Sequence, residues 1–394
     1  MFKEFKLLMV LFLLLFNVPA YSNNLCDIEI HAFASTGYIV SDKYNYLAES
    51  KDGTFEFNEA GVNFGASISE DMQVGMQLYS YDLGDVGNNT IKLDWAFIDY
   101  SWKEPLGLRL GKFKTPFALY SAILDYDMLY TQTILPQGIY NIYLRESIKS
   151  TQGINLYGKI NMGIAGIFDY NVYTGAVSID DNGSFAKHLS GENGLLKNGK
   201  AENIMGGRIK WNTAIKDLIL VASYLQADLT YELNISGVKT EIETPKSALK
   251  VLSAEYSIGD FNASFEYQIT TGNIFTKVDM TNIGLPVISK TENDYDIDTY
   301  YGKISYRFSK WFETGIYYSI YNEERIDGSI NYPDYEEWQK DLAVCFRFDI
   351  NDFWLMKFEI HHVKGVAQVI EHLQPEDYKG ENWTAFAYKT TFNF

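Results

Sequence analysis

Cysteine, histidine and proline are scarce in this chain of 394 residues, which contains only 2, 5 and 8 of them. Cys26 and Cys345 cannot set a disulfide framework, and we expect both to stay unpaired. The histidines show no metal-ligand spacing, because His361 and His362 are adjacent and neighbours on a strand point to opposite faces. No nucleophile motif such as GxSxG lies near the histidines. The sequence therefore predicts no metal site, no cofactor and no enzymatic activity.

Basic residues are also in deficit. The chain has 33 Lys and Arg against 51 Asp and Glu, which gives a formal net charge of -18. A nucleic-acid-binding protein presents a basic surface to the phosphate backbone. This charge balance therefore argues against nucleic acid as a partner.

Long apolar runs are missing beyond the N-terminus, where one short run occurs. Two lysines precede the stretch LLMVLFLLLFNV, and the small residues Ala20 and Ser22 follow it. The run is shorter than the ~20 residues that a membrane-spanning helix requires, and its flanks are those of a secretory signal. We predict a signal peptide at residues 1–22 and a mature chain at residues 23–394 that leaves the cytoplasm without a helical anchor.

Aromatic residues are abundant instead, at 16% of the chain, and they alternate with polar residues. In the closing stretch TAFAYKTTFNF, the rings of Phe386, Tyr388, Phe392 and Phe394 share one parity, while Ala, Lys, Thr and Asn occupy the other. The same alternation occurs at residues 261–270, 300–308 and 354–361. A strand with one apolar face and one hydrated face requires this period of two.

The connections between these strands alternate in length. Very short turns occur near residues 69–71, 103–107, 157–161, 213–217, 258–262, 308–311 and 350–353. Longer polar loops occur near residues 41–53, 83–90, 114–150, 174–203, 231–247, 271–297, 323–337 and 366–382. Short turns at one end and long loops at the other are typical of an outer-membrane barrel. We predict an all-β fold, a 16-stranded antiparallel transmembrane β-barrel in the bacterial outer membrane, whose first and last strands pair.

The last residue of the chain is an aromatic, Phe394. A terminal aromatic on the apolar face of a final strand resembles the signal read by the machinery that inserts outer-membrane barrels. We therefore expect Phe394 to act as an assembly signal and the barrel-assembly machinery to be a partner.

Two motifs resemble a known family. The stretch LRLGKFKTPFALYS at residues 108–121 is similar to the end of the fifth strand and the start of the third loop in the phosphate-selective porins O and P. The stretch FEFNEAGVNFGASI at residues 55–68 is similar to early strands of that family. The resemblance implies a porin, a homotrimer, and a third loop that folds back into the lumen as a constriction. Residues 114–150 fit such a loop, because they lack regular alternation and are rich in Tyr, Leu and Ile.

Charged residues of the predicted lumen form the candidate site, because a passive channel works through a charged, water-filled constriction. Bases on the wall opposed to acids on the loop would orient dipolar solutes. We predict a constriction with wall bases Arg109, Lys112, Lys114, Arg208 and Lys210, loop acids Asp125, Asp127 and Glu146, and the loop base Arg145. Strand parity adds the lumen-facing residues Lys92, Asp94, Lys303, Arg307, Arg347 and Lys357. The alternative for any one of these residues is that it only hydrates the lumen wall.

The sequence thus predicts an outer-membrane porin that passes small hydrophilic solutes and ions by passive diffusion. One alternative is a channel selective for phosphate or another anion, although arginines are sparse and acids interleave with the bases. Another is a surface adhesin or receptor that acts through acidic outer loops such as residues 321–338. Outer-membrane lipid and lipopolysaccharide would surround the barrel, and the loop acids could bind divalent cations that bridge lipopolysaccharide.

Overall fold

The computed structural model describes residues 28–47, 49–84, 86–145, 149–190, 194–235, 237–284, 288–325, 334–369, 374 and 380–394. The predicted signal peptide at residues 1–22 and Cys26 lie outside these ranges. Within them, no helix is long and apolar enough to cross a membrane.

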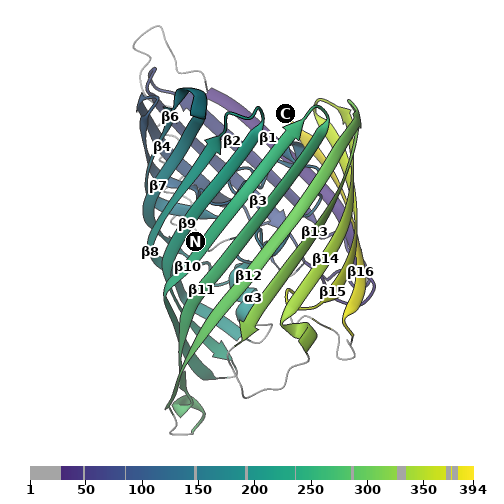
Figure 1. Cartoon of the computed structure of the whole chain (residues 1–394). Coiled ribbons are helices and arrows are strands. Elements are labelled where there is room, and N and C mark those ends of the chain that lie inside the picture. The colour runs from purple at the N-terminus through teal and green to yellow at the C-terminus, as the bar shows by residue number, and fades with distance from the viewer. Residues whose placement is uncertain are drawn as a thin grey trace.

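The described residues form sixteen strands that close into one antiparallel barrel (Figure 1). The strands are β1 (Ile28–Ser41), β2 (Asn58–Ser67), β3 (Met72–Asp82), β4 (Lys92–Lys103), β5 (Leu106–Lys114), β6 (Ser150–Asn161), β7 (Ile167–Ser178), β8 (Gly194–Asn212), β9 (Leu218–Ile235), β10 (Val238–Ile258), β11 (Phe261–Asp279), β12 (Ile288–Ser309), β13 (Phe312–Arg325), β14 (Trp338–Asn351), β15 (Trp354–Gly365) and β16 (Asn382–Asn393). Each strand pairs with its neighbours in sequence, and β1 pairs with β16, where Ala34 lies opposite Phe392. Because closure leaves no strand edge unpaired, the predicted 16-stranded antiparallel barrel is confirmed.

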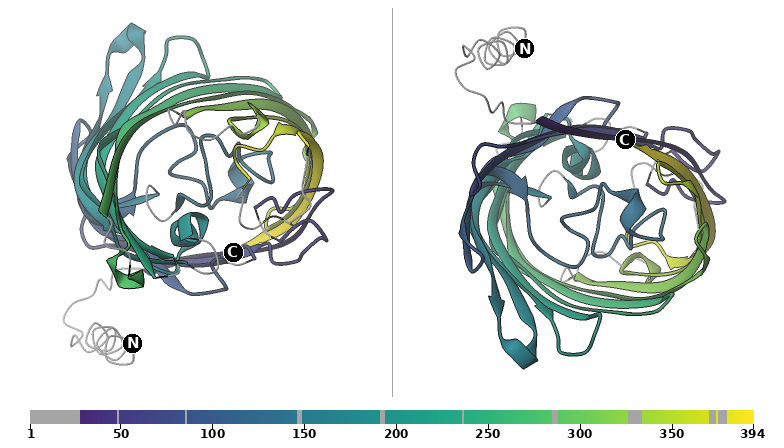
Figure 2. Two further views of the ribbon diagram at one scale, coloured as in Figure 1. Left: turned by 90° about the horizontal axis from the view of Figure 1, so that it is seen from below. Right: turned by 90° about the horizontal axis from the view of Figure 1, so that it is seen from above.

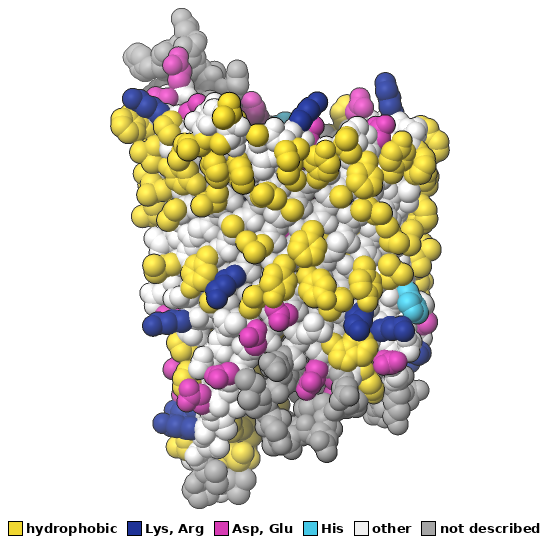
Figure 3. All heavy atoms as spheres, viewed as in Figure 1, with side chains coloured by type: hydrophobic (Ala, Val, Ile, Leu, Met, Phe, Trp, Pro, Cys, Tyr) yellow, Lys and Arg dark blue, Asp and Glu magenta, His cyan; other side chains and the backbone are white. Residues whose placement is uncertain are grey.

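Alternation along each strand separates the two faces of the wall. On β12, Tyr300 and Ile304 are 36% and 49% exposed on the outside, whereas Tyr301 and Lys303 are 0% and 6% exposed on the inside. Successive side chains of a strand point to opposite faces, so a period of two produces this division. Apolar side chains accordingly cover the middle of the outer surface, and charged ones gather toward its ends (Figure 3). An apolar outer band is what a transmembrane barrel presents to lipid.

Short turns lie at the upper end of Figure 1 and the longer connections at the lower end. The turn predicted at residues 157–161 is wrong, because β6 continues to Asn161 and the chain turns at residues 162–166. Gly163 and Gly166 adopt positive φ angles of 62° and 95° in this turn, a backbone conformation that glycine tolerates best. The strand therefore ends where these two glycines form the turn, and not where the apolar alternation stops.

The long loops predicted at residues 231–247 and 271–297 are also wrong. β9 and β10 continue until a connection at residues 236–237, and β11 and β12 leave only residues 280–287 between them. These strand ends run past the apolar band, so both of their faces can be polar while Thr, Val, Ile and Tyr keep the extended backbone favourable. The polar composition of residues 231–247 and 271–297 is therefore like that of a loop, although these residues form strands.

Residues 115–149, which we call the inner segment, lie inside the barrel (Figure 2). Residues 146–148 of this segment lie outside the described part of the chain. Phe117 and Tyr140 of the segment belong to one buried cluster with Val251 and Tyr301 of the wall. The apolar core of the molecule therefore lies within the barrel, between the inner segment and the wall.

Short helices occupy the connections. They are η1 (Asp127–Leu129) in the inner segment, η2 (Gly163–Ala165), α3 (Ser184–Ser190), η3 (Thr281–Ile283) and η4 (Asp334–Glu336). α3 follows β7 and lies within the barrel outline at the loop end (Figures 1 and 2). The Ser184 hydroxyl donates a hydrogen bond of 3.1 Å to the carbonyl of Tyr143, which joins α3 to the inner segment.

Candidate functional site in the barrel lumen

Glu266 of β11 forms one attachment between the wall and the inner segment. Its buried carboxylate accepts hydrogen bonds from the main-chain N–H of Leu119, at 2.9 Å, and from the Tyr140 hydroxyl. From the wall, the hydroxyls of Ser253 and Tyr301 donate to the same carboxylate at 2.5 and 2.8 Å. A buried carboxylate needs such donors to offset the loss of water. The four contacts fix the inner segment to β10, β11 and β12.

Arg347 of β14 binds the main chain of the segment to another part of the wall. Nη1 of Arg347 donates to the carbonyl oxygens of Met128 and Tyr130 at 2.8 and 3.3 Å. Nε and Nη2 donate to Asp349 at 2.9 and 2.8 Å. The planar guanidinium is thereby held on one side by a carboxylate, while its other side binds two carbonyls.

Two residues of β15 extend this attachment along the segment. The ammonium of Lys357 donates to the carbonyl of Gln132 at 2.8 Å. The carboxylate of Glu359 accepts the main-chain N–H groups of Thr133 and Ile134, the latter at 3.1 Å. Lys357 and Glu359 are two positions apart on one strand, so both point into the lumen. Lys357 and Glu359 thus bind the main chain of the segment at residues 132–134.

His361 lies beside this attachment, fully buried on β15. Its Nδ1 lies 2.9 Å from Asp341 of β14, and its Nε2 lies 3.3 Å from Glu359. His361 therefore links two buried carboxylates of the wall. Among the described residues, no group of three His, Cys, Asp or Glu is placed to hold a metal ion.

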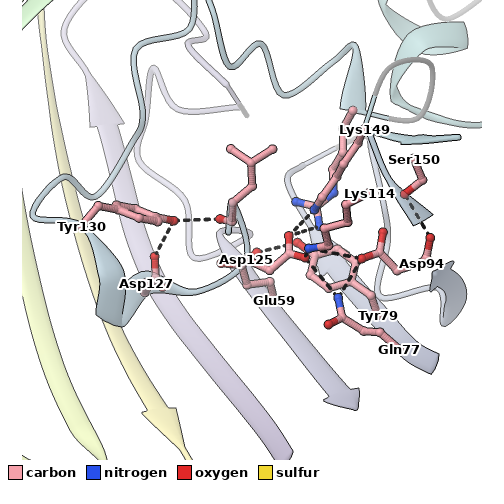
Figure 4. A network of polar contacts seen from close by, with 12 residues as sticks. Glu59, Gln77, Tyr79, Asp94, Lys114, Asp125, Asp127, Tyr130, Lys149 and Ser150 are labelled. Atoms are coloured by element: carbon pink, nitrogen blue, oxygen red, sulfur yellow. Dashed lines mark hydrogen bonds and ion pairs between the residues drawn. The ribbon is translucent and has the colours of Figure 1, made fainter. Parts of the chain in front are cut away.

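Asp125 is the centre of a buried ionic cluster (Figure 4). It is 1% exposed, and its carboxylate pairs with the ammonium groups of Lys114 and Lys149 and, at 2.7 Å, with Nη2 of Arg145. Gln77 of β3 adds a hydrogen bond of 3.1 Å. Burial raises the pKa of Asp125, but the three cations outweigh it and hold this pKa well below its usual range. The cluster joins the inner segment to β3 and β5.

Asp127 forms a second ionic cluster, with side chains of β15 and β16. Its carboxylate lies 3.0 Å from the ammonium of Lys389 and 3.6 Å from that of Lys357. The hydroxyls of Thr391 and Tyr130 donate to it at 2.7 and 3.2 Å. Burial raises the pKa of Asp127, but the two ammonium groups and the Thr391 hydroxyl lower it to about 2. The segment is therefore tied to β15 and β16 as well.

The predicted constriction residues fall into separate groups. Lys114, Asp125 and Arg145 come together in the first cluster. Arg109 lies elsewhere, where its Nη2 binds Asp99 at 2.6 Å. Arg109 precedes Lys114 by five residues on β5, which separates them by roughly 17 Å along the strand. Arg109 therefore does not face the acids of the inner segment.

The remaining predicted bases have other neighbours. The ammonium of Lys112 donates to the carbonyl of Leu93 at 2.7 Å. In the pairing of β8 with β7, Arg208 lies opposite Asn171 and Lys210 lies opposite Asp169. Glu146 lies outside the described residues, so its predicted role stays a prediction.

The residues assigned to the lumen by strand parity line the inner wall and have polar partners there. Lys92 pairs with Asp180 at 2.8 Å, and Asp94 lies 3.6 Å from Lys114. Lys303 donates to the Tyr120 hydroxyl at 3.2 Å, and Arg307 bridges Asp349 and Glu313 at 2.7 and 2.6 Å. Arg347 and Lys357 bind the inner segment as described above. Cys345 is buried without a disulfide.

Sequence reasoning missed Lys389 and Glu59, which extend the second cluster. Lys389 of β16 binds both Asp127 and Glu59 of β2. Lys389 shares its parity with Ala385 and Ala387, on the hydrated face of the last strand. That parity places it in the lumen, but the sequence gives no sign that β1 and β16 bring it beside Glu59.

The fold and its interior define a class of protein. A closed sixteen-stranded barrel with an apolar outer band, a charged interior and a segment inside it after the fifth strand has the architecture of bacterial outer-membrane porins. No family model and no curated protein sequence matches the chain.

Solved structures of outer-membrane channels are similar over nearly the whole chain. The anion-selective porin from Comamonas acidovorans has a TM-score of 0.57 and 15% identity, covering 94% of this chain and 100% of that one. OmpF of Salmonella typhi, solved with daunomycin, has a TM-score of 0.58 and 13% identity, covering 94% and 98%. The outer membrane channel DcaP of Acinetobacter baumannii has a TM-score of 0.57 and 9% identity, covering 95% and 99%. At such low identity, the likeness shows the fold.

Proposed function

We propose that this chain is an outer-membrane porin, a water-filled channel through which small hydrophilic solutes and ions diffuse down their gradients. The inner segment acts as its constriction. The observation that carries the proposal is the attachment of this segment inside the barrel, by Glu266 of β11 and by Arg347, Lys357 and Glu359 of β14 and β15. A segment held in this way narrows the lumen permanently and keeps charged groups at its surface.

Transport through such a channel needs no cofactor and no catalytic residue, because the solute gradient supplies the driving force. Charged side chains of the lumen replace part of the water around a polar solute, whereas an apolar solute gains nothing there. We also propose a homotrimer, as the resemblance to the phosphate-selective porins implies. The barrel-assembly machinery, outer-membrane lipid and lipopolysaccharide are the further partners expected of such a barrel.

An anion-selective channel is the second candidate. It is favoured by a cavity beside the inner segment that is lined by the bases Lys92, Lys112, Arg145 and Lys149 and by only two acids, Asp94 and Asp180. An adhesin or receptor role would use the acidic loop at residues 321–338, of which residues 326–333 lie outside the described part of the chain. No contact of the described residues favours that role.

The test is electrical. Purified protein is reconstituted in a planar bilayer, and its conductance and reversal potential are measured in a KCl gradient, with and without added phosphate. For a general porin, we expect the conductance to rise in proportion to the bulk KCl conductivity and to stay unchanged when phosphate is added. Anion selectivity with phosphate block would replace it by the second candidate. Absence of any conductance would contradict both channels and direct attention to the outer loops.

A further inference from the structure

Two cavities adjoin each other between the inner segment and the early strands of the barrel. One has a volume of about 100 Å³ and the other about 220 Å³. Tyr79, Tyr81, Arg145 and Lys149 line both of them. The two cavities therefore adjoin each other at these four side chains.

The larger cavity is basic, although the chain as a whole is acidic. Its exposed part is the Lys92–Asp180 pair, whose side chains are 34% and 43% exposed. Its deep part contains Arg145 and Lys149, whose side chains are 12% and 3% exposed. Lys92 begins β4 and Asp180 follows β7, so the exposed part faces the loop end of the barrel. A solute that enters from the loops meets this cavity on its way inward.

Tyrosine rings, as well as Asp125, stabilise the cations Arg145 and Lys149 in the deep part of the cavity. Arg145 lies 3.8 Å from the centre of the Tyr79 ring and 5.4 Å from that of Tyr81, and Lys149 lies 4.9 Å from that of Tyr79. Cations in such positions are attracted by the ring faces. Burial and then Arg145 lower the pKa of Lys149 to about 7, although Asp125 opposes them. At pH 6 the cavity therefore has its full positive charge.

The smaller cavity has a mainly apolar lining, which includes Leu47, Leu83, Phe117, Leu135, Ile139 and Ile142. Its charged lining residues, besides Arg145 and Lys149, are Glu59, Asp82 and Lys389. Transfer of an apolar group from water into such surroundings is favourable in proportion to the area buried. A basic cavity and a mainly apolar cavity thus meet at Tyr79, Tyr81, Arg145 and Lys149.

We propose that the two cavities bind one solute together, a carboxylate with a compact apolar body such as an aromatic monocarboxylate. The carboxylate accepts charge-assisted hydrogen bonds from Lys112 and Arg145 in the larger cavity. The apolar body lies against Tyr79 and reaches into the smaller cavity. This inference rests on the proposed porin function, because it names a solute class for the same lumen.

Isothermal titration calorimetry of the detergent-solubilised protein with potassium benzoate at pH 6 tests the site. Potassium acetate serves as the matched ligand without an apolar body, and we expect it to bind at least about tenfold more weakly. Lys112→Gln should weaken benzoate binding by about tenfold, the effect of one charge-assisted hydrogen bond. Lys310→Gln makes the same charge change at the turn between β12 and β13 and should leave the affinity unchanged.

Equal affinities for benzoate and acetate would overturn the site, and so would a folded Lys112→Gln variant that binds benzoate like the wild type. Far-UV circular dichroism shows whether each variant keeps its barrel, and the comparison of the two ligands in wild-type protein needs no variant at all. Binding in micelles requires no ion flow. A protein that binds benzoate but carries no current would overturn the porin proposal alone, whereas one that conducts without binding benzoate would overturn this site alone.

Discussion

Asp125 and Asp127 are two positions apart in the sequence, yet they bind different parts of the barrel wall. Asp125 pairs with bases of β5 and of the inner segment, whereas Asp127 pairs with bases of β15 and β16. Each carboxylate is 1% exposed. Removing one partner of a buried ion pair is costly because the other charge stays buried. These two residues therefore fix the position of the inner segment across the lumen.

Asp127→Asn gives a pH-dependent prediction. The folded pKa of Asp127 is about 2, below its usual value of 3.8, so its ionised form stabilises the folded protein above about pH 4 and this contribution is lost as the pH falls through 2. We expect the variant to lose about 2 kcal/mol in the free energy of unfolding at pH 6. Denaturant unfolding in detergent, repeated from pH 6 to pH 2, measures the difference between variant and wild type.

The difference should shrink toward pH 2. Asp352→Asn, at an exposed turn between β14 and β15, is the matched control and should change stability little at any pH. A loss of stability in Asp127→Asn that stays constant down to pH 2 would contradict the role assigned to the ionised carboxylate.

Among the elements, the strands were the part most accessible to sequence reasoning. Alternation located them because lipid on one side and water on the other impose a period of two. It failed at residues 231–247 and 271–297, where polar residues interrupt the alternation although β9 to β12 continue. The signal that separates a strand from a loop disappears there, although the backbone remains extended.

The inner segment shows a different limit. Its Tyr, Leu and Ile content predicted that residues 114–150 avoid water, and residues such as Phe117 and Tyr140 are indeed buried. The clusters around Asp125 and Asp127 were only partly foreseen, because alternation tells which face a residue takes but not at which depth. Arg109 and Lys114 were grouped for that reason, although different acids bind them.

Arg347→Met tests how the inner segment is held. Loss of the guanidinium frees the carbonyls of Met128 and Tyr130, so amides in residues 127–134 should exchange their protons about tenfold faster. Hydrogen exchange followed by mass spectrometry measures this rate, and the strands should stay protected. Arg109→Met is the control, because Arg109 binds Asp99 of the wall. Similar exchange in both variants would contradict a specific anchor at Arg347.

At the scale of the whole molecule, closure of the barrel depends on the last residues of the chain. The N–H and carbonyl of Phe394 exchange hydrogen bonds with Ala32 at 2.9 and 2.7 Å, beyond the end of β16. The Phe394 ring is 75% exposed on the outside. Phe394 thus joins the first and last strands by its main chain and leaves its side chain exposed, as the predicted assembly signal requires.

Deleting Phe394 should lower the yield of folded barrel several-fold, because both the final main-chain pairing and the terminal ring are lost. Heat-modifiable migration in denaturing gels measures the folded fraction in outer membranes. Phe394→Tyr keeps the pairing and an aromatic ring, and we expect it to assemble normally. Wild-type yield from the deletion variant would contradict the assembly role of this residue.

The main-chain attachment by Arg347, Lys357 and Glu359 has an evolutionary consequence. These wall residues recognise carbonyl and amide groups that every amino acid except proline provides, so these bonds do not depend on which side chains residues 128–134 carry. Exposed side chains elsewhere on the inner segment can therefore drift, or be redesigned, while the main-chain bonds stay in place. A barrel built in this way can acquire a new solute preference through a handful of side-chain exchanges on a stretch of backbone that stays where it is.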